Sequence, residues 1–278
     1  MSRAFISIDY EGLPHVVSYL HMSPGRPLYG EARRIATLFA SRVASRLLER
    51  GFGEVVVADS HGVMVNVDPF ELPRGVVLVR GFPRVLSMVT GARGCSAALF
   101  IGYHGAASTA SVLSHTYSIS VVHRVVVDGR QVSEYALNAM LLGEWGVPVV
   151  LVAGSEELGG EVRSLTPWAV WVPLKRSVGY LAASSPSMEE ALEGLLRGVD
   201  RAVEALERGE VRPLEPGRGH VFEVEFKLPL YAEAAATLPI VERVDGVRVR
   251  FRCEGFEECF RVFESLVLMA YAVKGFAR

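Results

Sequence analysis

Short apolar runs alternate with helical patterns along the first two-thirds of the chain. Within each run the apolar residues are consecutive, so both faces of the predicted strand are hydrophobic. This pattern is typical of parallel strands that are covered by helices on both sides. The predicted strands are Phe5–Ile8, Val55–Ala58, Val76–Val79, Ala97–Ile101 and Val147–Val152.

Helical periodicity separates these strands. In Glu31–Glu49, apolar residues such as Ile35 and Phe39 recur on one face, and Gly51 follows as a helix stop. A second helix is predicted over Glu134–Glu144, just before the last of the strands. Strands and helices in this order predict an α/β fold, a three-layer α/β/α domain with a largely parallel sheet.

One segment interrupts this order with a different signal. The apolar run Ser118–Val127 is followed by Asp128-Gly129, a pair that is typical of a tight hairpin turn. We therefore expect an antiparallel excursion between the fourth and fifth strands.

The last third of the chain has its own pattern. A long amphipathic helix over Met188–Arg208 leads into the Pro- and Gly-rich connector Gly209–Gly219. Beyond it, His220–Lys227 and Val247–Phe251 alternate as half-buried strands do, and Phe256–Val273 is helical. We therefore predict a catalytic domain over residues 1–209 and a smaller C-terminal α+β unit over residues 210–278, packed on the main domain.

Composition and charge narrow the class of protein. Half of the 278 residues are hydrophobic, which is enough for a large core, and 29 Lys and Arg balance 31 Asp and Glu. No basic cluster stands out, so we expect no nucleic-acid partner. The longest apolar run, Leu266–Val273, is far shorter than the ~20 residues that span a bilayer. Acidic residues also precede any leader-like segment, so we expect a cytoplasmic protein with no membrane partner.

The cysteines restrict the chemistry further. Cys95, Cys253 and Cys259 show no CxxC spacing, so neither a cysteine zinc site nor a disulfide framework is expected. We expect Cys253 and Cys259 to remain unpaired, because a reducing compartment is the default for such a chain. Any metal would have to be held by His, Asp and Glu.

Such residues follow three of the predicted strands. Asp9 and Glu11 come directly after the first strand, His61 follows the second, and His104 follows the fourth. In open α/β sheets, sites form beyond the carboxyl ends of the strands. Two carboxylates two residues apart point the same way in extended backbone and repel, unless a cation lies between them. Imidazole and carboxylate together favour zinc, with manganese or cobalt as competitors.

Each of these residues also has a simpler explanation. Asp9 and Glu11 could be exposed acids in a loop, His61 a turn residue, and His104 a buried imidazole with an ordinary hydrogen bond. Their coincidence at successive strand ends favours the metal site.

A set of motifs in a fixed order resembles the zinc-dependent D-aminopeptidases of the DppA type, peptidase family M55. The similarity spans nearly the whole chain. The motifs are Asp9-Tyr-Glu-Gly12, Asp59-Ser-His-Gly62, Gly102-Tyr-His104, Leu113-Ser-His-Thr-Tyr117, Glu134 with Asn138-Ala139, Gly146–Val152 and Leu238–Arg243.

The resemblance implies a binuclear zinc aminopeptidase that hydrolyses short peptides or amides with a free N-terminal amino acid of D configuration. Each subunit would hold two Zn²⁺ ions, bridged by Asp9, and a metal-activated water would attack the peptide bond. His115 would be the catalytic residue, as general base, oxyanion stabiliser or nucleophile. The implied metal ligands are Asp9, Glu11, His61, His104 and Glu134.

The resemblance also implies self-association into a ring-shaped homodecamer that encloses the active sites. The C-terminal unit and the Asp128-Gly129 hairpin are not needed to build the site, so we expect them to make subunit contacts. Two other functions remain open. One is a metal-dependent amidase or L-peptide aminopeptidase, and the other is a non-catalytic metal-binding ring protein.

Overall fold

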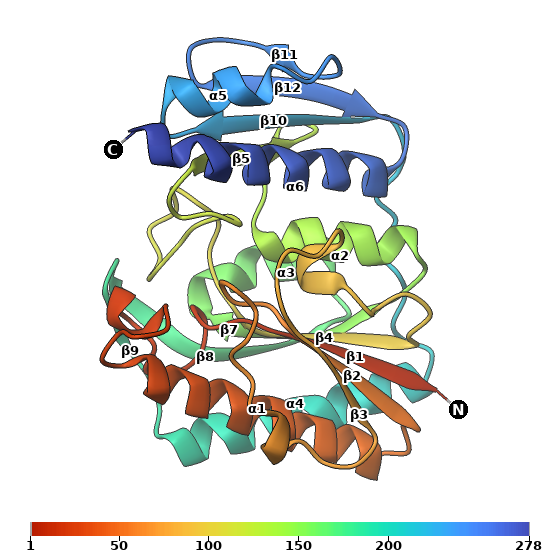
Figure 1. Ribbon diagram of the computed structural model, residues 1–278. Helices are drawn as coiled ribbons and strands as arrows, with labels where there is room; N and C mark the ends of the chain where they lie inside the picture. The colour runs from red at the N-terminus through yellow and green to blue at the C-terminus, as the bar shows by residue number, and fades with distance from the viewer. Residues whose placement is uncertain (1, 278) are drawn as a thin grey trace.

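The computed structural model describes residues 2–277 and contains two β-sheets with helices between and outside them (Figure 1). The larger, sheet A, has the strand order β3-β2-β1-β4-β7-β8-β9. All of its neighbouring strands are parallel except the last pair, β8 and β9. Its strands are β1 (Arg3–Ile8), β2 (Glu54–Asp59), β3 (Val76–Val79), β4 (Ala97–Tyr103), β7 (Val149–Ser155), β8 (Val170–Gly179) and β9 (Ala182–Ser184).

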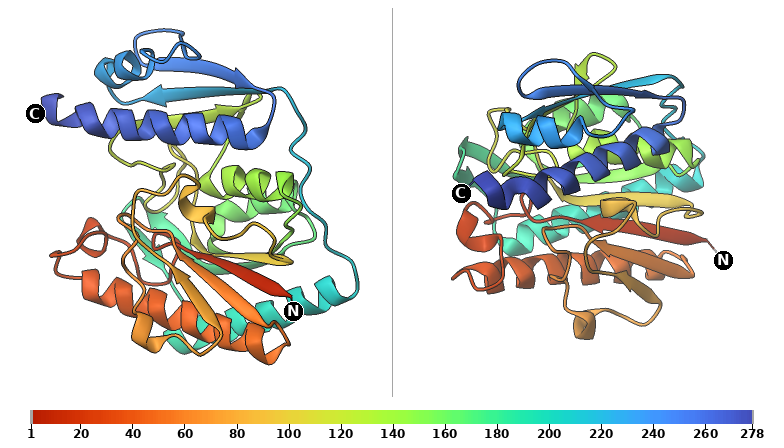
Figure 2. Two further views of the ribbon diagram at one scale, coloured as in Figure 1. Left: turned by 45° about the vertical axis from the view of Figure 1, so that its right-hand side comes forward. Right: turned by 45° about the horizontal axis from the view of Figure 1, so that its top comes forward.

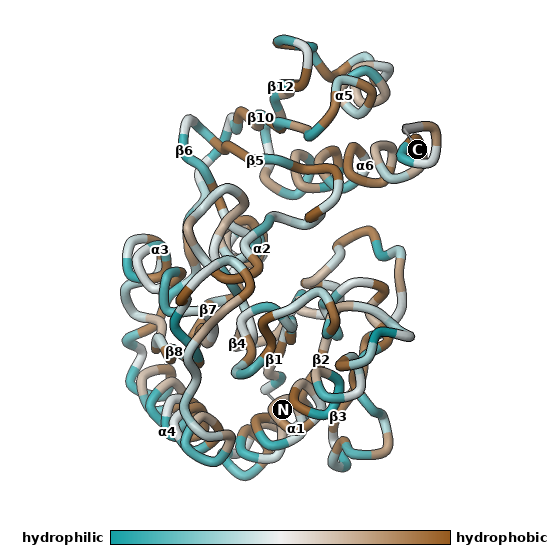
Figure 3. The backbone as a smooth tube through the Cα atoms, turned by 90° about the vertical axis from the view of Figure 1, so that its left-hand side faces the viewer, coloured by the Kyte–Doolittle hydropathy of each residue, from teal (hydrophilic) through white to brown (hydrophobic). Residues whose placement is uncertain are grey.

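Helices cover both faces of sheet A. On one face lie α1 (Tyr29–Glu49) and α4 (Met188–Glu207), and on the other lie α2 (Glu134–Glu144) and α3 (Gly159–Leu165), as Figures 1 and 2 show. Figure 3 shows hydrophobic stretches in the central strands, while α4 alternates between hydrophilic and hydrophobic residues. The predicted three-layer fold with a largely parallel sheet is confirmed.

Sheet B is antiparallel and takes strands from two distant parts of the chain. Its order is β11-β12-β10-β5-β6. Asp128 and Gly129 have φ values of 50° and 80°, as a tight hairpin turn between β5 and β6 requires, so the predicted antiparallel excursion is confirmed. The strands of sheet B are β5 (Val122–Val127), β6 (Arg130–Gln131), β10 (His220–Phe226), β11 (Glu242–Arg243) and β12 (Arg248–Cys253).

The C-terminal helix α6 (Phe256–Val273) lies between sheet B and α2 (Figure 1). Its residues Phe256, Phe260 and Phe263 are fully buried. They belong to one hydrophobic core that extends from sheet A through α2 and α6 into sheet B. Helix α5 (Pro229–Ala235) packs against α6. Short 3₁₀ turns occupy Tyr19–His21, Pro69–Glu71, Ser87–Val89, Glu156–Leu158 and Lys274–Ala277.

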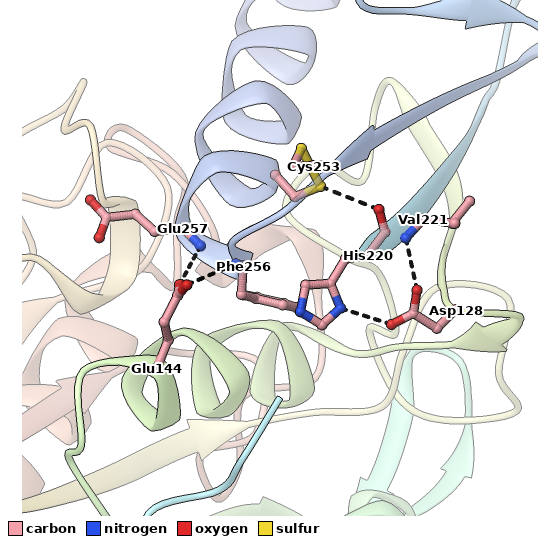
Figure 4. Close-up of a disulfide and its surroundings, with 8 residues drawn as sticks. Asp128, Glu144, His220, Val221, Cys253, Phe256 and Glu257 are labelled. Atoms are coloured by element: carbon pink, nitrogen blue, oxygen red, sulfur yellow. Dashed lines mark hydrogen bonds and ion pairs between the residues drawn. A yellow bond between two sulfur atoms is a disulfide. The ribbon is translucent and has the colours of Figure 1, made fainter. Parts of the chain in front are cut away.

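One expectation about the cysteines is wrong. Cys253 ends β12 and Cys259 lies near the start of α6, and the two form a disulfide with a Cα–Cα distance of 5.5 Å (Figure 4). The short turn after β12 folds the helix back against its own strand. This brings the two Cα atoms to a separation that suits a disulfide, which spacing in the sequence does not reveal. None of the helices within residues 2–277 is both long and apolar enough to cross a membrane.

Candidate metal centre

The six residues singled out in the sequence meet at the carboxyl-terminal edge of sheet A. Three of them follow strands: Asp9 comes directly after β1, His61 after β2 and His104 after β4. Glu134 is the first residue of α2, and His115 lies in the long loop between β4 and β5. Five of the six are buried, with exposures between 2 and 5%, and His115 is partly exposed. The simpler explanation of Asp9 and Glu11 as exposed loop acids is therefore excluded.

Two glycines allow the ends of β1 and β4 to touch. Gly102 has a φ of +78°, and a Cβ there would lie 2.1 Å from the carbonyl oxygen of Asp9. A Cβ on Gly12 would lie 1.9 Å from the carbonyl oxygen of Tyr103. The Gly12 N–H instead donates a hydrogen bond to the Gly102 carbonyl at 2.7 Å. Because only glycine fits this approach, the two motifs hold Asp9 and Glu11 beside His104.

One group of three side chains comes from the ends of β1 and β2. His61 Nδ1 lies 3.0 Å from Glu11 Oε2 and 3.5 Å from Asp9 Oδ1. The three donor atoms of Asp9, Glu11 and His61 all lie within 4.8 Å of one another. They can therefore share a single ion.

A second group of three lies next to the first. His104 Nε2 is 3.6 Å from Glu134 Oε2, and His115 Nε2 is 3.5 Å from Glu134 Oε1. The rings of His104 and His115 are stacked, with centroids 4.4 Å apart. These three donors also lie within 4.8 Å of one another. The geometry thus places His115 Nε2 among possible ligand atoms, whereas the sequence motif assigned it a catalytic role beside the metals.

Asp9 stands between the two groups. Its Oδ1 faces His61, and its Oδ2 lies 3.4 Å from His104 Nε2. Among the described residues, both Asp9 Oδ2 and His104 Nε2 are buried and have no hydrogen-bond partner. Buried polar atoms are almost always satisfied, so these two point to a missing ligand between them.

Backbone carbonyls fix the orientation of all three imidazoles. His61 Nε2 lies 2.8 Å from the Met22 carbonyl oxygen, and His104 Nδ1 lies 3.0 Å from that of Gly105. His115 Nδ1 lies 2.9 Å from the carbonyl oxygen of Leu113. A ring nitrogen that donates to a carbonyl leaves the other nitrogen unprotonated in the neutral ring, free to bind a metal.

The charges of the centre compensate one another. Burial lowers the pKa of His61 and His104, but the neighbouring carboxylates outweigh it and hold both pKa values well above the usual range. Burial raises the pKa of Glu11, yet the positive charges of His61 and His115 bring it well below the usual range. Burial and the charge of Glu11 raise the pKa of Asp9. The buried carboxylates thus favour positive charge at this place, which a divalent cation would supply.

The donor set fits a metal. It combines imidazole nitrogen and carboxylate oxygen atoms in two groups of three. Backbone carbonyls orient the imidazoles, and two buried polar atoms where the groups meet have no hydrogen-bond partner among the described residues. Imidazole with carboxylate is a ligand combination that suits Zn²⁺. Three donors in each group leave room for a water or a substrate atom.

The centre opens into a cavity of about 870 Å³. Asp9, His115 and Glu134 line it, as do residues of α6. A cavity of this volume holds a small ligand such as a short peptide.

Two residues that the sequence analysis did not assign support or border the site. Asp59 accepts hydrogen bonds from Asn66 Nδ2 and from the Val67 N–H, both at 2.7 Å, and Asn66 also donates to the His61 carbonyl. Asp59 therefore shapes the loop that carries His61. Glu264 is buried in α6 and lines the cavity. Its signal in the sequence was an acidic residue on the apolar face of a helix.

A third unassigned residue is Lys175, on β8. It is buried, and its ammonium group donates to the Val16 carbonyl in the loop after Glu11. Burial lowers its pKa to about 7, against the opposing effect of Glu11 and Asp9. Lys175 therefore ties β8 to the loop that carries the first carboxylates.

Comparisons with known proteins agree over almost the full chain. The sequence model of the D-aminopeptidase family, peptidase family M55, matches residues 2–265. A D-aminopeptidase of Bacillus subtilis (strain 168) is 31% identical over 277 residues, which cover 98% of each chain. A solved structure, described as the Zn-dependent D-aminopeptidase DppA from Bacillus subtilis, a self-compartmentalizing protease, superposes with a TM-score of 0.91. It is 28% identical, and the match covers 97% of this chain and 98% of that one.

Proposed function

The chain belongs to the D-aminopeptidase family, peptidase family M55, and is a hydrolase that acts on peptide bonds. From this premise we propose a zinc-dependent aminopeptidase with two Zn²⁺ ions in each subunit, which removes an N-terminal D-amino acid from short peptides or amides. The observation that carries the proposal is the pair of three-donor groups joined by Asp9, whose two carboxylate oxygens face opposite imidazoles.

The proposed ligands are divided by this geometry. Asp9, Glu11 and His61 would hold one ion, and His104 and Glu134 the other, with Asp9 shared between them. When bound, zinc supplies the Lewis acidity that polarises a scissile carbonyl and activates water near neutral pH. Backbone carbonyls keep the imidazoles in place, so the ligands need little rearrangement to bind.

His115 has the position of a proton-transfer group. It is the most exposed of the six side chains, at 13%, and it lines the cavity beside Glu134. Its Nδ1 is engaged by the Leu113 carbonyl, so Nε2 is the atom that faces the reacting groups. We propose that Nε2 accepts a proton during attack and returns it to the leaving amine.

The proposed function also includes the assembly of the chain and its choice of substrate. The Bacillus subtilis protein is described as self-compartmentalizing, which supports assembly of this chain into a closed ring, and we propose a homodecamer. The name of the Bacillus subtilis relative supports a preference for D residues, and an L-peptide aminopeptidase or an amidase is the alternative. The cytoplasmic location stays a prediction.

Metal analysis joined to an activity assay tests the proposal. We expect about two zinc ions per chain after loading and dialysis, by atomic emission. Hydrolysis of D-Ala-p-nitroanilide should exceed that of the L isomer, should fall at least about 100-fold after chelation, and should return with added zinc.

A variant that tests the shared ligand is Asp9→Asn, which keeps the shape of the side chain and removes its charge. It should lose both bound zinc and activity. Activity that resists chelation in the wild type, or less than one zinc per chain after loading, would contradict the proposal.

A further inference from the structure

Glu264 is an acidic side chain on the buried face of α6. It is only 6% exposed, and its atom Oε1 has no hydrogen-bond partner within the part of the chain that the structure describes. On either side of it along the same face lie Phe260, Phe263 and Val267, all buried. An unsatisfied carboxylate oxygen in apolar surroundings is costly, and native proteins keep such groups where a ligand satisfies them.

No ion pair with Glu264 forms among the described residues. The charge of Arg84 lowers the pKa of Glu264, but the terminal nitrogens of the Arg84 guanidinium donate to the backbone carbonyls of Asp59 and Val79, at 2.6 and 3.2 Å. No ion pair joins Glu264 to a basic residue among positions 2–277. The carboxyl group therefore has no ion-pair partner within the described part of the chain.

Glu264 faces the same cavity as the metal centre. Glu134 and His115 line the cavity of about 870 Å³, and so do Glu264 and Val267. Tyr117 lies between them: its N–H donates to Glu134 Oε1 at 2.6 Å, and its ring packs edge-on against Phe263 at 5.2 Å. Thus one aromatic residue links the candidate ligand Glu134 to the turn of α6 that carries Glu264.

The local environment affects the pKa of the Glu264 carboxyl group in both directions. Burial raises the pKa of Glu264 to about 8. The charge of Glu134 also raises it, while a hydrogen bond with Ser87 and the charge of Arg84 lower it. Ser87 is itself buried with a φ of +40°, a strained conformation for a non-glycine residue. An incoming cation would favour the ionised form of Glu264, and the pair would gain a charge-assisted hydrogen bond.

We propose that Glu264 is a specificity-determining residue that binds an ammonium group of the substrate while the scissile bond lies at the metal centre. This rests on the proposed aminopeptidase function. A carboxylate only accepts hydrogen bonds, and an ammonium group offers three donors together with the opposite charge. A peptide substrate presents this group in two places, at its free N-terminus and on a basic side chain.

The test compares Glu264→Gln with wild type, both zinc-loaded, on the p-nitroanilides of D-Ala, D-Leu and D-Lys. Glutamine keeps the shape of the side chain and removes its charge. The matched control is Glu258→Gln, which removes the same charge from an exposed position of the same helix and should leave all constants unchanged. Equal melting temperatures and zinc contents establish that both variants are folded.

We expect Glu264→Gln to raise KM about tenfold or more, with a smaller change in kcat. If KM rises for all three substrates, Glu264 binds the N-terminal ammonium group. If KM rises for D-Lys alone, Glu264 binds the side-chain ammonium group. Unchanged KM values for all three overturn the proposal.

A binding measurement separates this inference from the proposed function. If zinc-loaded wild type hydrolyses none of the substrates, the proposed function fails. Calorimetry then compares D-alaninamide with (R)-lactamide, in which a hydroxyl group replaces the amine. The ammonium site is supported if wild type binds D-alaninamide more tightly than (R)-lactamide and Glu264→Gln does not. Equal binding of the two ligands by wild type overturns the ammonium site.

Discussion

The three imidazoles of the centre are oriented before any ion arrives. Each has one ring nitrogen at a backbone carbonyl oxygen, of Met22, Gly105 or Leu113, at 2.8 to 3.0 Å. Backbone atoms hold these rings more rigidly than mobile side chains would, and the opposite nitrogens converge on the carboxylates. Preorganisation of this kind lowers the cost of binding and positions charge for the reaction.

Replacing His115 tests the proposed proton transfer. We expect His115→Ala to keep the zinc bound by the proposed ligands Asp9, Glu11, His61, His104 and Glu134, and to lower kcat at least about 100-fold, because a proton-transfer group is lost. Stopped-flow or steady-state kinetics on a metal-replete sample, with zinc measured in parallel, checks this.

A control for this variant is His15→Asn, at an exposed histidine whose φ of +64° asparagine tolerates. It should behave as wild type. Near-normal turnover in zinc-replete His115→Ala would refute the catalytic role, and loss of one zinc ion would instead make His115 a ligand, as its distance to Glu134 allows.

Part of this site was predictable from the residues alone. Asp9, His61 and His104 follow apolar strands directly, and parallel strands deliver such residues to one edge. Glu134 and His115 lie far from any strand end in the predicted order, and only the ordered motifs identified them. The carbonyl of Met22 was beyond prediction, since every residue has a carbonyl and only the fold selects one.

Helix α6 contributes to the lining of the cavity, so its position matters for the site. Its first turn is held by α2: Glu144, the last residue of that helix, accepts hydrogen bonds from the N–H groups of Phe256 and Glu257, at 3.0 and 2.5 Å (Figure 4). The start of α6 thus receives its cap from another helix. The disulfide between Cys253 and Cys259 ties the same turn to β12.

The cap leads to a prediction about stability. Glu144→Ala leaves two N–H groups of the first turn of α6 without their acceptor, so we expect the free energy of unfolding to fall by about 1–2 kcal/mol. Chemical denaturation followed by circular dichroism measures it. Glu258→Ala, which removes an exposed acid from the same turn, should cost a few tenths of a kcal/mol. Equal effects of the two changes would show that the contact does not act as a cap.

The elements were predictable where their pattern is local. The strands β1 to β4 and the helices α1, α2, α4 and α6 were found within a few residues of their bounds. Strand β8 was missed, because Pro173 interrupts its run; Pro173 lies in the part of β8 that β9 does not pair. The antiparallel pairing of β5 with β10 could not be predicted either. Nearly a hundred residues separate the two strands, and their pairing depends on the tertiary fold.

The surface of the single chain carries several large, exposed apolar side chains. Phe70, Val85 and Val178 are 94, 63 and 75% exposed. Large exposed apolar side chains are often buried in assemblies. They suit a subunit that packs against copies of itself, as expected for a relative of a self-compartmentalizing protease.

The mass of the assembly in solution tests the ring. Ten chains of 30.3 kDa give a particle of about 303 kDa, which multi-angle light scattering at micromolar concentration distinguishes from a monomer or dimer. The peak should be single and its mass independent of dilution, because an enclosing ring buries surface on each subunit. Val178→Asp, a charge on an exposed apolar position of β8, should shift the mass downward if that strand lies in an interface, whereas Val85→Asp reports on the opposite edge of sheet A. A monomer in the wild type would exclude the ring, and with it the idea that substrates reach the site through an enclosed chamber.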